Sequence, residues 1–139
     1  MDVNKLKNST IEELENDYWT ESADFTGLMR TLYVTRKKKI GEYEPEDFRV
    51  LINQNIGLKH LIPLVIDILI KNPFIEANYF EGDLLKSILS SDKNFWNSNI
   101  GMKEEVVKLF EGNKSAFDEL DLTESIKNEI LDAYENFRK

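Results

Sequence analysis

Residues 45–73 read PEDFRVLINQNIGLKHLIPLVIDILIKNP and contain the longest apolar segment of the chain. Pro45 suits the first position of a helix, where the backbone donor that it lacks has no partner in any case. The acidic side chains of Glu46 and Asp47 then complement the positive end of the helix dipole. The run from Asn53 to Gly57 ends this helix, because Asn and Gly enter the left-handed backbone conformation at the least cost. The stretch therefore predicts two helices joined by a tight turn.

The second helix of this pair, about residues 58–71, carries a narrow polar stripe. At about 100° per residue, its non-aliphatic side chains fall within one third of the circumference. They are Lys59, His60, Pro63, Asp67 and Lys71. The other two thirds are apolar: Leu58, Leu61, Ile62, Leu64, Val65, Ile66, Ile68, Leu69 and Ile70. Such an arc is wider than a surface helix needs, so the pattern predicts a central helix packed on several neighbours.

Capping residues indicate where other helices begin. Ser9 and Thr10 each precede a glutamate by three residues, as in overlapping capping boxes. Later helices are expected to begin at Thr26, Asp83 and Thr123. Another is expected over residues 102–110, and a short turn or helix at residues 95–96. No strand pattern exceeds a few residues. We therefore expect an all-α fold, a compact single domain over residues 1–139 with about six to eight helices around the central apolar helix.

The composition is that of an ordinary globular protein, with 41% hydrophobic and 32% charged residues in 139. The absence of cysteine excludes disulfides and thiolate metal sites. Residues 1–7 lack the apolar segment of a secretory signal, so a cytoplasmic protein is expected. The apolar run from Leu61 to Ile70 is far shorter than the roughly 20 residues that cross a bilayer. We expect no membrane contact.

The formal net charge of −8 disfavours nucleic acid as a ligand and favours a cationic partner. Acidic residues are concentrated between Lys7 and Arg30, where no basic residue occurs. The cluster consists of Glu12, Glu13, Glu15, Asp17, Glu21 and Asp24. One interpretation is a capped helix followed by a solvated loop. The other is an anionic patch, with Tyr18 and Trp19 as apolar anchors, that faces a basic protein.

Catalytic and cofactor sites find little support. His60 is the only histidine, so sites with two histidines are excluded, and a small hydrolase would need this residue as a base beside Asp67 or Asp83. The six glycines are isolated and form no phosphate-binding loop. The basic run Arg36–Lys39 lies at a predicted helix C-terminus, where cations stabilise the dipole. We expect no catalytic residue, no metal and no cofactor.

Several of these motifs together resemble the helical immunity proteins of contact-dependent growth inhibition (CDI) systems. The resemblance runs from residues 11–19 to Phe95-Trp96. Its strongest parts are LINQNIGL at 51–58, Pro63, Asn72-Pro73 and EGDLL at 81–85. The chain departs from the family pattern at Asn53, where a glycine is expected, and near Val65, where a small helix former is expected. Residues 101–139 carry no part of the resemblance.

The resemblance implies a cytoplasmic, non-enzymatic protein that binds the C-terminal toxin domain of a cognate effector and blocks it. The toxin is expected to be a basic nuclease whose active site or substrate surface is covered, in a 1:1 complex with an otherwise monomeric protein. Because the motif residues are spaced for burial and backbone geometry, the toxin contacts are expected in loops and at element ends. The candidate toxin-binding residues are Asp17, Trp19, Glu21, Asp24, Glu42, Glu76 and Tyr79. An acidic helical adaptor for another cytoplasmic protein is the alternative.

Overall fold

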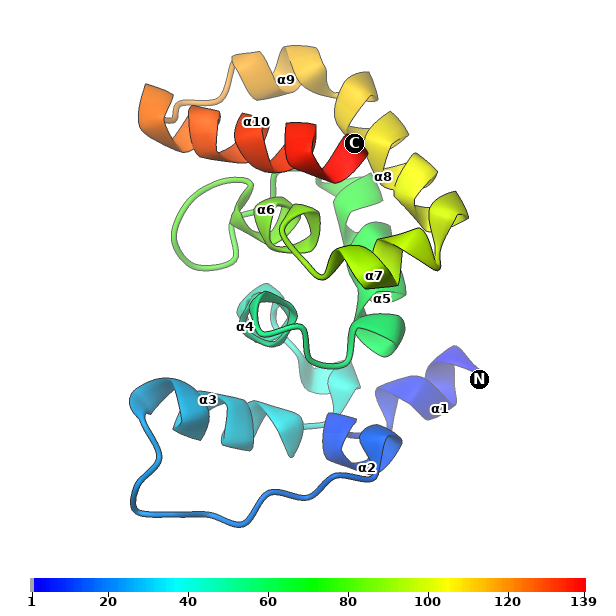
Figure 1. Cartoon of the computed structure of the whole chain (residues 1–139), viewed down its shortest axis with the longest axis vertical. Coiled ribbons are helices and arrows are strands. Elements are labelled where there is room, and N and C mark those ends of the chain that lie inside the picture. The colour runs from blue at the N-terminus through cyan, green and yellow to red at the C-terminus, as the bar shows by residue number, and fades with distance from the viewer. Residues whose placement is uncertain (1) are drawn as a thin grey trace.

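The structure is a computed structural model that describes residues 2–139, and it confirms the all-α prediction. The helices within these residues are α1 (Val3–Lys7), α2 (Ile11–Glu15), α3 (Gly27–Arg36), the 3-10 helix η1 (Ile40–Glu42), α4 (Pro45–Asn53), α5 (Leu58–Lys71), α6 (Asp83–Leu89), α7 (Lys93–Asn97), α8 (Ile100–Gly112), α9 (Lys114–Asp118) and α10 (Glu124–Arg138). Figure 1 shows α2 and α3 at one end of the molecule and α8, α9 and α10 at the other.

Eight of these α-helices correspond to the expected ones. The sequence did not indicate α1 and α9, which have five residues each. A helix of five residues is little more than one turn, so it has no apolar repeat from which it could be recognised. No helix within residues 2–139 is both long and apolar enough to span a bilayer.

The turn between α4 and α5 has the predicted geometry. Pro45 stands in the first turn of α4. Asn55 and Gly57 have positive φ angles of 56° and 66°. A Cβ atom at Gly57 would lie 2.8 Å from the Cδ1 atom of Ile11, so glycine is required both for the backbone conformation and for the close approach of α2.

Helix caps are confirmed at three of the expected positions. Thr10 forms a reciprocal capping box with Glu13, and the hydroxyls of Thr26 and Thr123 accept hydrogen bonds from the first turns of α3 and α10. The overlapping box at Ser9 does not form, because its hydroxyl donates to the carbonyl of Lys5 at 2.8 Å. The prediction of a cap at Asp83 is also wrong: the N-cap of α6 is Gly82.

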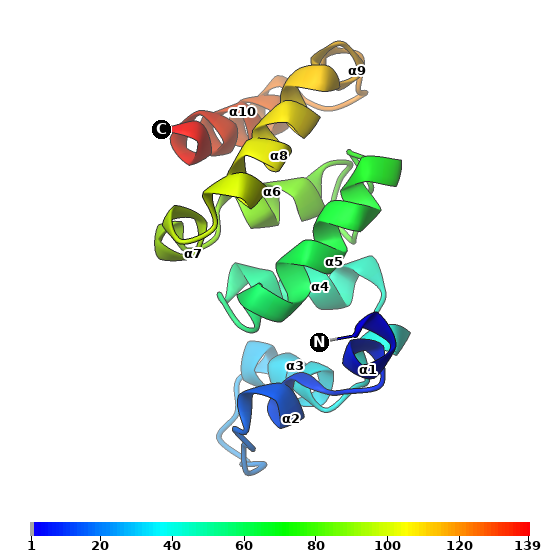
Figure 2. The ribbon, with the colours of Figure 1, turned by 90° about the vertical axis from the view of Figure 1, so that its right-hand side faces the viewer.

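Helix α5 contributes six buried side chains to a continuous apolar core that extends from Ile11 to Phe137. Its predicted polar stripe is exposed or half-buried. The buried arc is nevertheless narrower than the apolar arc, since Leu64 and Ile68 are half-buried and Ile70 is 62% exposed. Neighbouring helices thus cover only part of the apolar surface of α5. Figure 2 shows α5 and α1 on the side of the molecule that faces the viewer.

Candidate functional site

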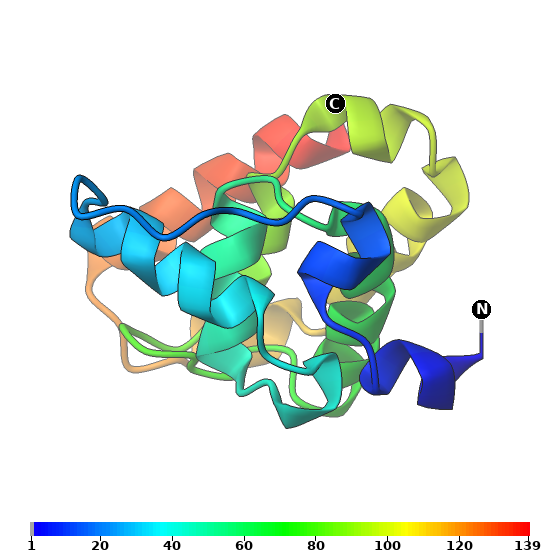
Figure 3. The same cartoon turned by 90° about the horizontal axis from the view of Figure 1, so that it is seen from below.

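Residues 17–26, here called the acidic loop, connect α2 to α3 without helical structure. Figure 3 shows the loop running alongside α3 on the face nearest the viewer. Its first residues are held by Arg36, whose side chain is 1% exposed. The Nη2 atom of Arg36 donates to the backbone carbonyl of Asp17 at 2.6 Å, and the guanidinium carbon lies 4.4 Å from the ring centroid of Trp19. A buried cation therefore fixes the loop where it leaves α2.

The basic run that contains Arg36 ends α3, as expected, but its side chains reach carboxylates of other elements. Arg36 Nη2 lies 3.8 Å from a carboxylate oxygen of Glu15 and 3.6 Å from one of Asp17. The Nζ atom of Lys37 lies 3.2 Å from the Glu12 carboxylate, and that of Lys38 lies 2.9 Å from Asp47. The hydrogen bond to Asp47 raises the pKa of Lys38 above its usual value. These contacts join α2, α3 and α4.

The acidic cluster is consequently less anionic than its sequence indicates. Glu12, Glu15 and Asp17 face the basic run, and Glu21 forms an ion pair with Arg30 at 2.8 Å. The basic residues that neutralise the cluster follow it in the chain, so a count between Lys7 and Arg30 misses them. Asp24 is exposed and forms no ion pair within residues 2–139.

Exposed apolar side chains accompany these acids. Of the eight large apolar side chains that are exposed within residues 2–139, four belong to the acidic loop and α3: Tyr18, Leu28, Met29 and Val34. We call these four residues, together with Glu21 and Asp24, the α3 face. The three on α3 point in different directions around the helix, so what they share is exposure next to the charges of the acidic loop. Exposed apolar side chains beside charges are typical of protein-binding sites.

Three aromatic rings stabilise the acidic loop from within. The ring centroids of Trp19 and Phe25 are 6.4 Å apart, and those of Phe25 and Tyr33 are 5.6 Å apart. Trp19 is half-buried, with its ring packed against Phe25 and Arg36, so these contacts stabilise the fold and leave less of the ring accessible to a partner. Tyr18, which is 58% exposed, is the more accessible of the two predicted apolar anchors.

A second loop, residues 74–82, is here called the aromatic loop. The carboxylate of Asp83, a side chain that is 5% exposed, accepts hydrogen bonds from the backbone amides of Ala77, Asn78 and Tyr79 at 2.7, 3.0 and 2.9 Å. This role explains why Asp83 is not a helix cap: its oxygens point back into the preceding loop. Gly82 closes the loop with a φ of 91°, and its amide donates to the carbonyl of Phe74 at 3.0 Å.

The aromatic loop presents Tyr79, which is 69% exposed. The guanidinium carbon of Arg49 lies 4.7 Å from the centroid of this ring, and Arg49 also forms a bidentate pair with Glu46. Glu76 is exposed on the same loop. In Figure 1 the aromatic loop lies at the left, beside α6, whereas the acidic loop runs along the bottom of the molecule from α2 to the start of α3.

The structure brings together four of the seven candidate residues on the acidic loop: Asp17, Trp19, Glu21 and Asp24. It places Glu76 and Tyr79 on the aromatic loop. Glu42 lies elsewhere, in η1, which packs beside α1. Leu28, Met29 and Val34 are exposed beside the residues of the acidic loop but are not among the seven candidates. The exposure of Val34 could have been predicted from the helical periodicity of α3. At about 100° per residue, Val34 points about 160° away from Leu32 and Arg36, which are buried.

His60 lines an open hollow with Glu15 and Asp92, but within residues 2–139 its side chain forms no hydrogen bond or ion pair with a carboxylate. The oxygens of Asp83 are engaged by three backbone amides, and Asp67 lines a groove on α5 that does not include His60. Burial and the charge of Lys59 lower the pKa of His60 below its usual value. No group of three or more histidine, aspartate or glutamate side chains within residues 2–139 is arranged to hold a metal ion.

A family model described as CDI immunity proteins matches residues 3–106, which include both loops and the α4–α5 turn. No curated protein and no solved structure matches the chain.

Proposed function

The chain belongs to the family of CDI immunity proteins, and we propose from this membership that it binds the toxin domain of its own CDI system and neutralises it. The protein acts by binding rather than by catalysis, in the cytoplasm and with one copy for each toxin domain. The match over three quarters of the chain is the observation that carries this proposal.

The toxin in this proposal is a basic nuclease. A nuclease must attract phosphates, so its active-site cleft is positively charged, and an acidic protein can cover the cleft in place of the substrate. The net charge of −8 supports this, because attraction between opposite charges also speeds association.

The α3 face is the surface that we assign to the toxin. It combines exposed apolar side chains, of which Val34 is 59% exposed, with exposed carboxylates at Glu21 and Asp24. Apolar side chains supply most of the affinity of such an interface, whereas charges at its edge supply the rate and the selectivity of association.

Co-expression with the cognate toxin domain tests the proposed activity. Cells that produce the toxin alone should stop growing, and cells that also produce this protein should grow, with a 1:1 complex visible by size-exclusion chromatography with light scattering. Equal toxicity with and without the protein, and no complex at low salt, would contradict the proposal. A stable complex with a protein that is not toxic would favour the adaptor alternative.

Matched substitutions test the assigned surface. Val34→Ser should weaken toxin binding about tenfold, because the interface loses the burial of one valine side chain. Ile100→Ser changes an apolar residue of α8 that is 50% exposed and should leave toxin binding unchanged. Asp24→Lys should slow association about fivefold at low salt, whereas Asp121→Lys makes the same change in net charge at another exposed position and should slow it less. Equal effects within either pair would remove the assignment to the α3 face.

A further inference from the structure

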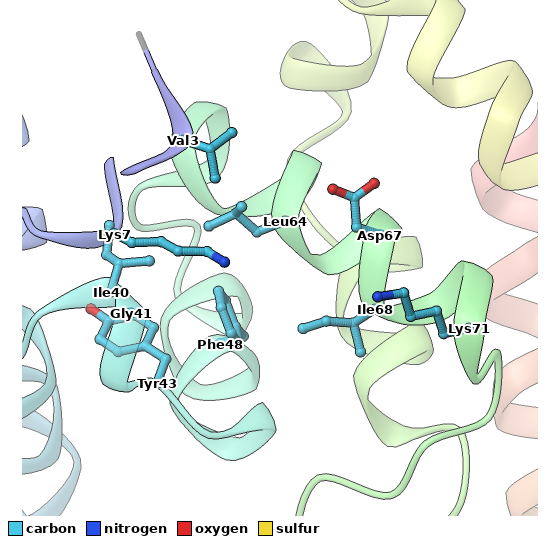
Figure 4. A pocket seen from close by; sticks show the side chains of 10 residues that line it. All are labelled: Val3, Lys7, Ile40, Gly41, Tyr43, Phe48, Leu64, Asp67, Ile68 and Lys71. Carbon is cyan, nitrogen blue, oxygen red and sulfur yellow. The ribbon is translucent and has the colours of Figure 1, made fainter. Parts of the chain in front are cut away.

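A groove runs between α1 and α5, on a different face of the molecule from the acidic loop. Its volume is about 350 Å³, within the range of small-molecule sites. Figure 4 shows the side chains around it. Its lining residues are Val3 and Lys7 of α1, Ile40 and Gly41 of η1, Tyr43, Phe48 of α4, and Leu64, Asp67, Ile68 and Lys71 of α5.

The apolar lining of the groove is the part of the α5 arc that the core leaves uncovered. Leu64 and Ile68 are half-buried, although α5 already buries six other apolar side chains. Opposite them, Val3 is 53% exposed, and α1 buries none of its side chains. Apolar surface of a helix that is not buried in the core can bind an apolar ligand.

The charges of the groove identify the kind of ligand. None of the three charged residues of the groove, Lys7, Asp67 and Lys71, forms an ion pair within residues 2–139, so the cations outnumber the anion by one. Asp67 precedes Lys71 by one helical turn, and Figure 4 shows these two side chains on the same side of Leu64. Lys7 extends into the groove from the opposite wall, above Phe48, and the one carboxylate among the labelled side chains, that of Asp67, lies on the far side of Leu64 from it. The groove thus offers an apolar floor and, at the α1 wall, an uncompensated ammonium group.

We propose that the groove binds a small carboxylate with an apolar chain, whose carboxylate pairs with Lys7 while its chain lies along Phe48, Leu64 and Ile68. A basic protein domain is the wrong occupant, because it would meet a positive charge at this wall. The site is therefore separate from the α3 face, and its ligand does not depend on the identity of the toxin.

Binding of octanoate and of 1-octanol to the full chain, measured by amide chemical shifts in NMR spectra, tests the proposal. Octanoate should shift signals of groove residues such as Gly41 and bind about fivefold more tightly than 1-octanol, the range of a partly exposed ion pair. Lys7→Gln should abolish this difference. Lys5→Gln, on the same short helix but outside the groove, should preserve it.

A second pair of variants tests the apolar floor. Ile68→Gln should weaken both ligands, whereas Ile70→Gln, on the same helix but outside the groove, should weaken neither. Unchanged thermal unfolding of each variant shows that the fold is retained. The proposal fails if octanoate leaves the groove signals unshifted, if 1-octanol binds as tightly, or if Lys5→Gln and Lys7→Gln have equal effects.

Discussion

The acidic loop and the aromatic loop are each held by one buried charge, but the charge is used differently in each. Asp83 binds three consecutive backbone amides that lie four to six residues before it. Arg36 binds one backbone carbonyl, 19 residues away, and covers one ring. The carboxylate of Asp83 fixes the middle of the aromatic loop. Beyond Asp17 the acidic loop is held by Arg30, which donates to the carbonyl of Ser22 at 3.3 Å, by short-range hydrogen bonds and by aromatic contacts. This difference supports the proposal that the acidic loop serves recognition, whereas the aromatic loop belongs to the scaffold.

The largest effect is expected for Asp83→Asn. An amide has one acceptor oxygen in place of two and presents donors to the loop amides, so buried N–H groups lose their partners. We expect a loss of about 3 kcal/mol in the free energy of unfolding, measured by urea denaturation. Asp92→Asn, at the exposed N-cap of α7, keeps an equally favoured capping residue and should cost less than about 0.5 kcal/mol. A small effect of Asp83→Asn would show that the aromatic loop does not depend on this carboxylate.

A smaller effect is expected for Arg36→Met, which keeps a long buried side chain but removes the charge. The carbonyl of Asp17 can then turn to water, because this residue is exposed, so the cost in unfolding free energy should be about 2 kcal/mol. The change should be local: limited proteolysis should cut residues 17–26 faster while residues 74–82 stay resistant. Equal cleavage of both loops would contradict the proposed independence of the two.

The smallest effect concerns the backbone at the ends of the loops. Gly82→Ala places a side chain at a φ of 91°, with its Cβ 3.1 Å from Ile130 Cδ1, and should cost about 1 to 2 kcal/mol in unfolding free energy. Asn16, just before the acidic loop, has a φ of 50°, and Asn16→Gly should change the free energy by less than about 0.5 kcal/mol. Thermal denaturation of both variants compares the two ends. A neutral Gly82→Ala would show that the aromatic loop adapts more readily than its hydrogen bonds indicate.

The features that depend on neighbours along the chain could be predicted from the sequence. The caps at Thr10, Thr26 and Thr123 and the left-handed turn before α5 follow from local backbone chemistry. The turn residues are also those that carry the resemblance to the family, which the family match confirms.

Features that depend on distant partners could not be predicted. No local pattern indicates that Arg36 reaches back 19 residues to Asp17, and thus that the acidic cluster is partly neutralised. The uncovered side of α5 was missed for the same reason, because the width of its buried arc depends on where its neighbours pack. The acidic candidates on the acidic loop could be recognised from the clustering of their charges in the sequence. The exposure of the apolar residues of α3 became visible only in the folded structure.

Hydrogen–deuterium exchange of the protein, free and bound to its toxin domain, tests most directly the claim that one loop serves recognition and the other the scaffold. Binding should slow exchange over residues 17–36 and leave residues 74–82, which are already protected by Asp83, unchanged. Slower exchange over residues 74–82 with none over residues 17–36 would contradict the account.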